Sequence, residues 1–153
     1  MKNPHLEIER KFLIGRLPRN LERYPRSEIT QGYLALGRRA HVRLRKNGRV
    51  CTLTFKRGPG RAREEREIHL NPAQFAILWP ATEGARLTKT RYYLPYRGLT
   101  IEIDIYHGSN EGLMVAEVEF ADSQTYHSFR PPAWLGQEVT GASGYSNVRL
   151  ARD

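Results

Sequence analysis

The chain has 153 residues and a formal net charge of +9 at pH 7, so an anionic partner is expected, although charge alone does not separate nucleic acid from small phosphates. Its single cysteine, Cys51, excludes an internal disulfide and fits a reducing compartment. No apolar run approaches the roughly 18 residues of a membrane span, and the first residues lack the apolar core of a signal peptide. We therefore expect one cytoplasmic domain, covering residues 1–153, that does not insert into a membrane.

The first predicted strand has the sequence LEIERKFLI, in which charged and apolar residues alternate. Because successive side chains of a strand point to opposite faces, Glu7, Glu9 and Lys11 share one face, while Ile8 and Phe12 share the other. This pattern predicts a strand with one charged and one apolar face.

Seven further strands are predicted by the same alternation. Asn47-Gly48 is a strong hairpin signal, and Gly58-Pro59-Gly60 and Arg97-Gly98 are further turn signals. The glycine-rich turn is not a phosphate-binding P-loop, because no Gly-Lys-Ser/Thr follows it. In chain order the strands are expected at residues 28–36, 41–45, 50–56, 63–70, from 88 to the Arg97-Gly98 turn, 99–106 and 113–120.

Three short helices are predicted outside these strands. Asn71 followed by Pro72 is typical of a helix start, because asparagine caps the free N–H groups and proline tolerates the first helical position. The helices are expected from Asn71-Pro72 to about Trp79, from Asp122 or Ser123 to about Phe129, and from Tyr145 to Arg152.

Taken together, the strands have one charged and one apolar face. The simplest interpretation is an antiparallel sheet whose charged face meets water and whose apolar face is covered by helices. The charges are segregated by strand into Glu-x-Glu, Arg-x-Arg and Lys-x-Arg pairs, however, and such pairs add nothing to the stability of an exposed surface. Eight antiparallel strands can also close into a barrel, whose charged interior would need bound metal ions and phosphate. Both interpretations are compatible with the periodicity.

The charged residues also match a known family. Glu7-x-Glu9-x-Lys11 resembles the signature of the CYTH superfamily, the triphosphate tunnel metalloenzymes. The resemblance covers essentially the whole chain, and it implies an α+β, mainly β fold: an eight-stranded antiparallel closed barrel with a few short helices packed outside. Further motifs in the family's order are Gln31-Gly32-Tyr33-Leu34, Arg43-x-Arg45, Lys56, Glu65-x-Glu67, Lys89-x-Arg91, Glu102-x-Asp104, Glu117-x-Glu119 and Tyr145-Ser146-Asn147.

The resemblance also implies roles for these residues, although ion pairing between strands remains the structural alternative for each. Lys11 would bind phosphate or act as a base, and Tyr33 matches a tyrosine near the chemistry. Glu65 and Glu67 would orient the attacking water or hold a second metal ion. The remaining residues would bind phosphate (Arg43, Arg45, Lys56, Lys89 and Arg91) or hold one or two Mg²⁺ or Mn²⁺ ions (Glu7, Glu9, Asp104, Glu117 and Glu119).

Two features of the sequence fall outside this pattern. The five histidines show no paired metal-ligand spacing, and we interpret them as ordinary residues. Gly144 stands just before Tyr145, where the family often carries a charged residue.

The resemblance implies metal-dependent hydrolysis of a triphosphate, with inorganic tripolyphosphate as the favoured substrate. The alternatives are thiamine triphosphatase, class IV adenylate cyclase or, in a different class, a basic barrel that binds RNA or another polyanion. Nucleic acid is disfavoured, because eight carboxylates on the charged face would repel it. The expected partner is a small triphosphate, and the protein is expected to be a monomer or a homodimer.

Overall fold

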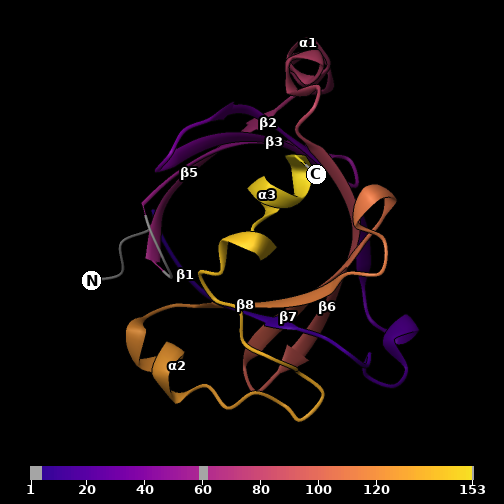
Figure 1. Cartoon of the computed structure of the whole chain (residues 1–153), viewed down its shortest axis with the longest axis vertical. Helices are drawn as coiled ribbons and strands as arrows, with labels where there is room; N and C mark the ends of the chain where they lie inside the picture. Colours follow the sequence, from indigo (N-terminus) through magenta and orange to yellow (C-terminus); the bar gives the residue numbers. More distant parts are fainter. Residues whose placement is uncertain (1–4, 59–61, 153) are drawn as a thin grey trace.

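Eight antiparallel strands close into a barrel in the computed structural model, which describes residues 5–58 and 62–152 (Figure 1). The order around the ring is β1-β5-β4-β3-β2-β6-β7-β8, and β8 pairs with β1. The closed barrel confirms the expected fold class, with β2 and β6 beginning slightly earlier than predicted; Pro59 and Gly60 of the predicted turn lie outside the described residues. The strands are β1 (Leu6–Leu13), β2 (Arg26–Leu36), β3 (Ala40–Asn47), β4 (Val50–Arg57), β5 (Ala62–Leu70), β6 (Arg86–Tyr96), β7 (Leu99–Tyr106) and β8 (Met114–Phe120).

The charged faces of the strands point into the barrel, so the main hydrophobic core lies outside its wall. Ile101 and Val118 have no exposed surface, and they pack in one cluster with Phe12 and Phe129. Helix α2 (Ser123–Ser128) and the segment that follows it cover this cluster (Figure 1). Burying each large apolar side chain contributes about 1.5–3 kcal/mol, so this cluster stabilises the wall without filling the interior.

Helix α1 (Pro72–Leu78) projects from the outside of the barrel (Figure 1). Its start is fixed by a capping box: the Gln74 N–H donates to the Asn71 side chain at 2.8 Å, and the Asn71 N–H donates to the Gln74 side chain at 2.9 Å. The predicted helix start is therefore confirmed. The short 3₁₀ turns are η1 (Leu21–Arg23), η2 (Trp79–Thr82), η3 (Gly108–Asn110) and η4 (Ser143–Tyr145).

Helix α3 (Asn147–Arg152) lies within the ring of strands, whereas α1 and α2 pack outside as expected (Figure 1). Leu150 and Ala151 of α3 are buried in a second cluster with Tyr33. The Asn110 side chain donates a hydrogen bond to the Leu150 carbonyl at 2.9 Å. The C-terminal helix therefore forms part of the lining of the barrel.

A segment after α2 completes the wall where β1 and β5 separate. The two strands pair only over the first part of β1, from Leu6 to Ile8. Further along β1, the Val139 N–H donates to the Lys11 carbonyl and the Gly136 N–H to the Leu13 carbonyl, both at 2.8 Å. A Cβ at position 136 would lie 2.9 Å from that carbonyl oxygen, so the contact favours glycine.

Among the described residues, no helix has both the length and the apolar character needed to cross a membrane.

Candidate active site

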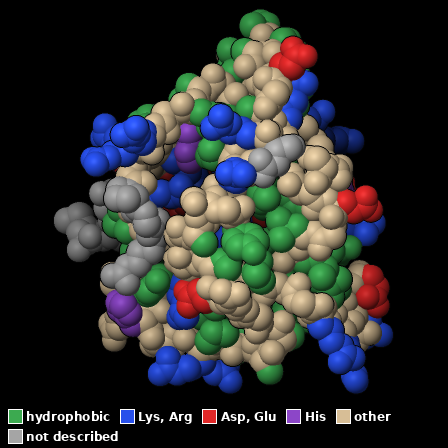
Figure 2. Space-filling view, viewed as in Figure 1, with side chains coloured by type: hydrophobic (Ala, Val, Ile, Leu, Met, Phe, Trp, Pro, Cys, Tyr) green, Lys and Arg blue, Asp and Glu red, His purple; other side chains and the backbone are tan. Residues whose placement is uncertain are grey.

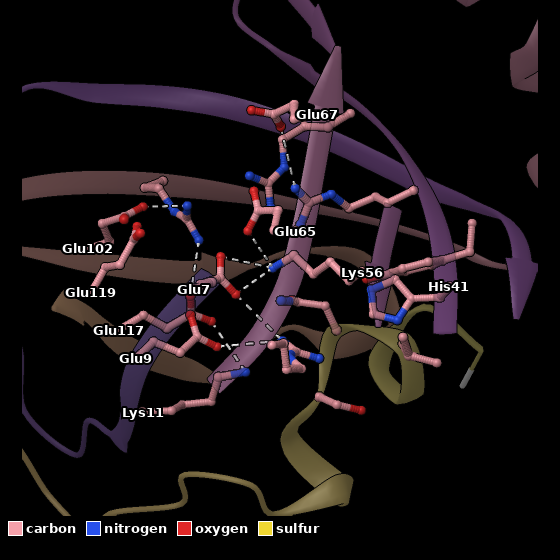
Figure 3. A pocket seen from close by; sticks show the side chains of 18 residues that line it. Glu7, Glu9, Lys11, His41, Lys56, Glu65, Glu67, Glu102, Glu117 and Glu119 are labelled. Carbon is pink, nitrogen blue, oxygen red and sulfur yellow. Dashed lines mark hydrogen bonds and ion pairs between the residues drawn. The ribbon is translucent and has the colours of Figure 1, made fainter. Parts of the chain in front are cut away.

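The barrel encloses a charged cavity of about 190 Å³ (Figure 3). In the space-filling view, its mouth is a hollow with basic and acidic side chains inside it, beside a group of apolar side chains (Figure 2). Every residue predicted to form the site lines this cavity except Lys89 and Asp104. The cavity is also lined by His41, Arg63, Glu102, Ser146, Asn147 and Val148, which were not among the predicted site residues.

Carboxylates from β1, β7 and β8 form one side of the cavity. Glu9 lies opposite Glu119 in the β1–β8 ladder, and Glu102 lies opposite Glu117 in the β7–β8 ladder. Like charges in such positions repel each other. Burial, together with the charges of Glu117 and Glu7, raises the pKa of Glu9 to about 7. This side of the cavity therefore carries negative charge that the protein only partly neutralises.

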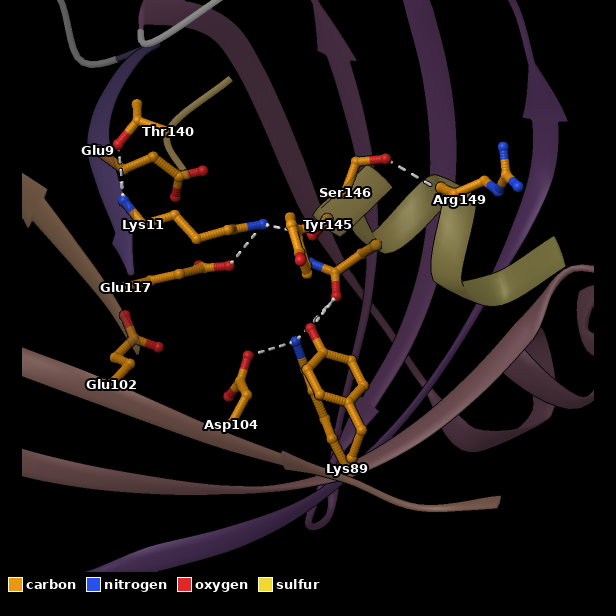
Figure 4. Close-up of polar contacts among 12 residues, drawn as sticks. Glu9, Lys11, Lys89, Glu102, Asp104, Glu117, Thr140, Tyr145, Ser146 and Arg149 are labelled. Atoms are coloured by element: carbon orange, nitrogen blue, oxygen red, sulfur yellow. Dashed lines mark hydrogen bonds and ion pairs between the residues drawn. The ribbon is translucent and has the colours of Figure 1, made fainter. Parts of the chain in front are cut away.

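Two lysines pair with carboxylates of this cluster (Figures 3 and 4). Lys56 Nζ donates to the two oxygens of Glu7 at 2.8 and 3.1 Å. Burial opposes ionisation of Glu7, but the charge of Lys56 outweighs it and lowers the pKa of Glu7 to about 2. Lys11 Nζ lies 3.3 Å from Glu117 and donates to the Tyr145 carbonyl at 3.1 Å. Burial opposes the charge of Lys11 as well, but Glu117 keeps its pKa above the ordinary value, so Lys11 is cationic at neutral pH.

Glu65 and Glu67 reach the cavity from β5. The Glu65 carboxylate lies 3.5 Å from Lys56 Nζ, and burial together with a hydrogen bond to Glu7 raises the pKa of Glu65 to about 7. The Thr54 hydroxyl donates to Glu67 at 2.8 Å. Glu65 therefore titrates close to neutral pH.

Lys89 and Asp104 form a fully buried ion pair that is not part of the cavity lining (Figure 4). Lys89 Nζ donates to Asp104 Oδ2 at 2.7 Å, and Arg91 donates to Asp104 Oδ1 and Oδ2 at 2.7 and 2.8 Å. Arg91 also pairs with Glu102, which does line the cavity. Burial lowers the pKa of Lys89 to about 7, whereas Arg91 and Lys89 keep the pKa of Asp104 below its ordinary value. Both oxygens of Asp104 thus bind cations of the protein, whereas the sequence predicts Asp104 as a metal ligand.

Arg43 and Arg45 on β3 face the carboxylates. Arg45 donates through Nε and Nη2 to the Gln31 side-chain oxygen at 3.0 and 2.8 Å, and burial lowers its pKa to about 10. Arg43 Nη2 donates to the Thr54 hydroxyl at 3.3 Å. Among the described residues, the buried Arg43 Nε has no hydrogen-bond partner. A buried donor without a partner is costly, so Arg43 favours an incoming acceptor such as a phosphate oxygen.

Comparison with known proteins identifies the family. No protein-family model matches the chain. An inorganic triphosphatase of Nitrosomonas europaea is 42% identical to it over 149 residues, covering 95% of this chain and 96% of that protein. The chain belongs to the family of short CYTH-type inorganic triphosphatases.

Other comparisons agree with this assignment. An inorganic triphosphatase of Acetivibrio thermocellus is 34% identical over 151 residues, covering 96% of this chain and 94% of that protein. A crystal structure of an inorganic triphosphatase matches with a TM-score of 0.71 and 38% identity, over 96% of this chain and 95% of that one. A protein from Pyrococcus horikoshii shares the fold, with a TM-score of 0.60, 18% identity, and coverage of 79% and 82% of the two chains.

The inorganic triphosphatase cavity contains residues that sequence reasoning left out. His41 was interpreted as ordinary, yet it alternates with Arg43 and Arg45 along β3, and this spacing indicates the inner face. Glu102 alternates with Asp104 on β7, and of the two it is Glu102 that lines the cavity. Asn147 of α3 belongs to the Tyr145-Ser146-Asn147 motif, but no strand alternation predicts that it lies inside the barrel. Its position depends on how the C-terminal helix enters the barrel.

The acidic side of this triphosphatase cavity suits a divalent cation. Among residues 5–58 and 62–152, no group of three or more histidine, cysteine, aspartate or glutamate side chains is arranged to hold a metal ion. The donor set nevertheless fits, because Glu9, Glu117 and Glu119 offer the carboxylate oxygens that Mg²⁺ and Mn²⁺ prefer. The raised pKa of Glu9 indicates a site that a cation would stabilise.

Proposed function

We propose that the protein hydrolyses inorganic tripolyphosphate in the barrel cavity, with one or two divalent cations bound by the glutamates. The observation that carries this proposal is the division of the cavity, with carboxylates on β1, β7 and β8 and arginines on β3. In a complex of a divalent cation with polyphosphate, the cation suits the carboxylates and the phosphate oxygens suit the arginines. The two inorganic triphosphatase relatives, which align over nearly the whole chain, support the same reaction.

Arg43, Arg45, Lys56 and Arg91 would bind the phosphate oxygens. Arginine suits this role because its planar guanidinium can donate two parallel hydrogen bonds to a phosphate. Lys11 is cationic through its contact with Glu117, which supports phosphate binding more than a role as a base.

Lys89 would act indirectly, because it is buried against Asp104 and does not line the cavity. In this arrangement Lys89 and Asp104 hold Arg91 in place, and Asp104 is a positioning residue instead of a metal ligand.

Glu7, Glu9, Glu117 and Glu119, together with Glu102, would hold Mg²⁺ or Mn²⁺. When bound, the ion supplies positive charge that neutralises phosphate oxygens during hydrolysis. Glu65 and Glu67 would orient the attacking water from the β5 side. Burial keeps the Tyr33 hydroxyl protonated by raising its pKa, so Tyr33 would serve as a neutral donor near the phosphates.

The buried, unpaired Cys51 fits a reducing compartment, and we propose that the protein acts in the cytoplasm. Mg²⁺ and Mn²⁺ are both hard cations with a preference for oxygen ligands, and the glutamates suit either.

Phosphate release from tripolyphosphate, ATP and thiamine triphosphate, each with Mg²⁺, Mn²⁺ or EDTA, tests the proposal. We expect the fastest release from tripolyphosphate with a divalent cation, and almost none in EDTA. Equal release in EDTA would refute metal dependence. Faster turnover of thiamine triphosphate or of ATP, with pyrophosphate and a cyclic nucleotide as products in the second case, would favour the corresponding alternative.

A further inference from the structure

His41 stands among cationic residues that line the cavity, although the proposed reaction gives it no role. It lies opposite Lys56 in the β3–β4 ladder, and its side chain lines the cavity (Figure 3). Its ring packs against Tyr33 at a centroid distance of 5.2 Å and an interplanar angle of 84°. Tyr33 is buried, so this contact restricts the orientation of the imidazole.

The imidazole nitrogens are available to a ligand. Among the described residues, neither ring nitrogen of His41 has a hydrogen-bond partner in the protein. A neutral imidazole has one donor and one acceptor nitrogen, whereas a protonated imidazole has two donors. Only the protonated form is fully suited to phosphate oxygens, which accept hydrogen bonds.

The charges around His41 keep it neutral in the ligand-free barrel. Lys56 from β4, Arg63 from β5 and Arg43 from β3 face it, and Glu7 from β1 is the carboxylate that opposes them. Burial and these three cations lower the pKa of His41 to about 4. Tyr33 from β2 is protonated and adds no charge. A polyanion bound to the same cations would cancel the repulsion that opposes protonation.

We propose that His41 is a further substrate-binding residue, which takes up one proton from solvent when tripolyphosphate enters the barrel. The inference rests on the proposed function, because it requires the polyanion to occupy this cavity. One N–H bond forms on the imidazole and no bond of the substrate breaks. The imidazolium then donates to a phosphate oxygen beside Lys56 and Arg43. An opposite charge within hydrogen-bonding distance raises a pKa by about 1–3 units, so at about pH 5.5 the protonated share of bound His41 rises from a few per cent to between about a quarter and nearly all.

Calorimetric titration of tripolyphosphate in EDTA, at about pH 5.5 in two buffers of different ionisation enthalpy, counts the protons taken up. His41→Gln keeps a polar side chain that does not titrate in this range, and His127→Gln alters an exposed histidine of α2 as the matched control. We expect wild type and His127→Gln to take up about 0.2–0.9 proton more than His41→Gln. The difference between variants removes the contributions of the carboxylates and of tripolyphosphate itself. Equal uptake by all three proteins would overturn the role of His41.

A second measurement on the unmodified protein is independent of how well the variant folds. The proton NMR signal of the His41 imidazole, assigned by its absence in His41→Gln or through the backbone, reports its protonation directly. We expect its titration midpoint to rise by about 1–3 pH units when tripolyphosphate is added. An unchanged midpoint with saturating tripolyphosphate overturns the inference while leaving the proposed function intact. Failure of the wild-type protein both to bind and to hydrolyse tripolyphosphate overturns the two together.

Discussion

Lys89 Nζ and Asp104 Oδ2 lie 2.7 Å apart in a part of the barrel where neither residue has any exposed surface. Arg91 donates to the same carboxylate through two nitrogens, so one buried aspartate organises two cations. Taking three charges out of water is costly, and the arrangement is stable only while all partners are present. Because Arg91 lines the cavity, this pair connects the stability of the wall to the geometry of the site.

Asp104→Asn should therefore destabilise the protein. It leaves Lys89 buried without its counter-ion and removes one carboxylate partner of Arg91, and breaking a buried pair in this way costs about 3–5 kcal/mol. Urea unfolding measures the free energy of unfolding, with Glu102→Gln as the control, because Glu102 lines the cavity and, among the described residues, pairs with Arg91 and not with Lys89. A stable Asp104→Asn protein that has lost metal affinity would restore the metal-ligand role predicted from the sequence.

Glu9→Gln should abolish most of the activity. If Glu9 is a metal ligand, its loss should reduce the rate at least about a hundredfold, since even the loss of groups that orient metal ligands costs 10–100-fold. Glu119→Gln, on the opposite strand, should behave similarly, whereas the exposed Glu22→Gln should not. Metal-dependent phosphate release by each purified protein measures the effect. Near-normal rates in both Glu9→Gln and Glu119→Gln would contradict the ligand assignment.

The same Glu9→Gln change should stabilise the metal-free protein at high pH. The folded pKa of Glu9, about 7, lies above the ordinary value of 4.5, so the unfolded chain loses this proton first as pH rises. The contribution of Glu9 to stability is thus fully present below pH 4.5 and is lost as pH rises to about 7. Glu9→Gln removes this loss, which amounts to at most about 3 kcal/mol. In thermal unfolding with EDTA, the melting temperature of Glu9→Gln should rise relative to that of wild type between pH 5 and 8. A difference in melting temperature that stays constant over this range would contradict the raised pKa of Glu9.

Arg43→Ala and Lys56→Ala should weaken substrate binding. Each loses one charge-assisted hydrogen bond, worth about 1.5–3 kcal/mol, which corresponds to roughly 10–150-fold in kcat/KM. If the contact is equally strong in the ground and transition states, the change appears in KM. Steady-state phosphate release separates KM from kcat, with the exposed Arg57→Ala as a matched control on β4. Normal kinetics in Arg43→Ala or Lys56→Ala would remove that residue from the substrate site.

Much of this arrangement could be predicted because strands have a strict period of two. Once Glu7 and Glu9 are placed on the inner face, the pairs Arg43-x-Arg45 and Glu117-x-Glu119 follow by alternation, and closure of eight strands brings them together. Alternation gives the face of a residue but not its depth along the barrel axis. Asp104 and Glu102 share a face, for example, yet only Glu102 reaches the cavity.

Contacts made by irregular segments could not be predicted in the same way. The pairing of Val139 with Lys11 depends on where β1 and β5 separate, which no local pattern records. Entry of α3 into the barrel depends on tertiary hydrogen bonds: the Tyr106 hydroxyl donates to Asn147 at 2.6 Å, and Lys89 Nζ donates to it at 3.4 Å. Directly after Gly144, the Tyr145 carbonyl accepts a hydrogen bond from Lys11 Nζ at 3.1 Å.

Binding of polyphosphate and a divalent cation inside the barrel should raise the melting temperature without any turnover. A ligand that binds only the folded protein adds RT ln(1 + [L]/Kd) to its stability, about 2.7 kcal/mol at a hundredfold excess over Kd. For a chain of this length the melting temperature should rise by about 5–10 °C, at ~2–4 °C per kcal/mol. Tripolyphosphate with Ca²⁺, a cation expected to support little turnover, is the test ligand, and sulfate at equal ionic strength is the control.

Salt then distinguishes an enclosed site from an exposed charged face. At ~0.3 M salt the Debye screening length is shorter than about 8 Å. Salt therefore weakens exposed ion pairs far more than ion pairs inside a barrel. The ion pairs of Arg91 with Glu102 and of Lys56 with Glu7 lie within the cavity, and the Arg91 and Lys56 side chains are largely buried. The rise in melting temperature should therefore survive added salt in large part. A shift that salt abolishes, or none with any divalent cation, would falsify binding inside the barrel, because only a surface site is screened so readily.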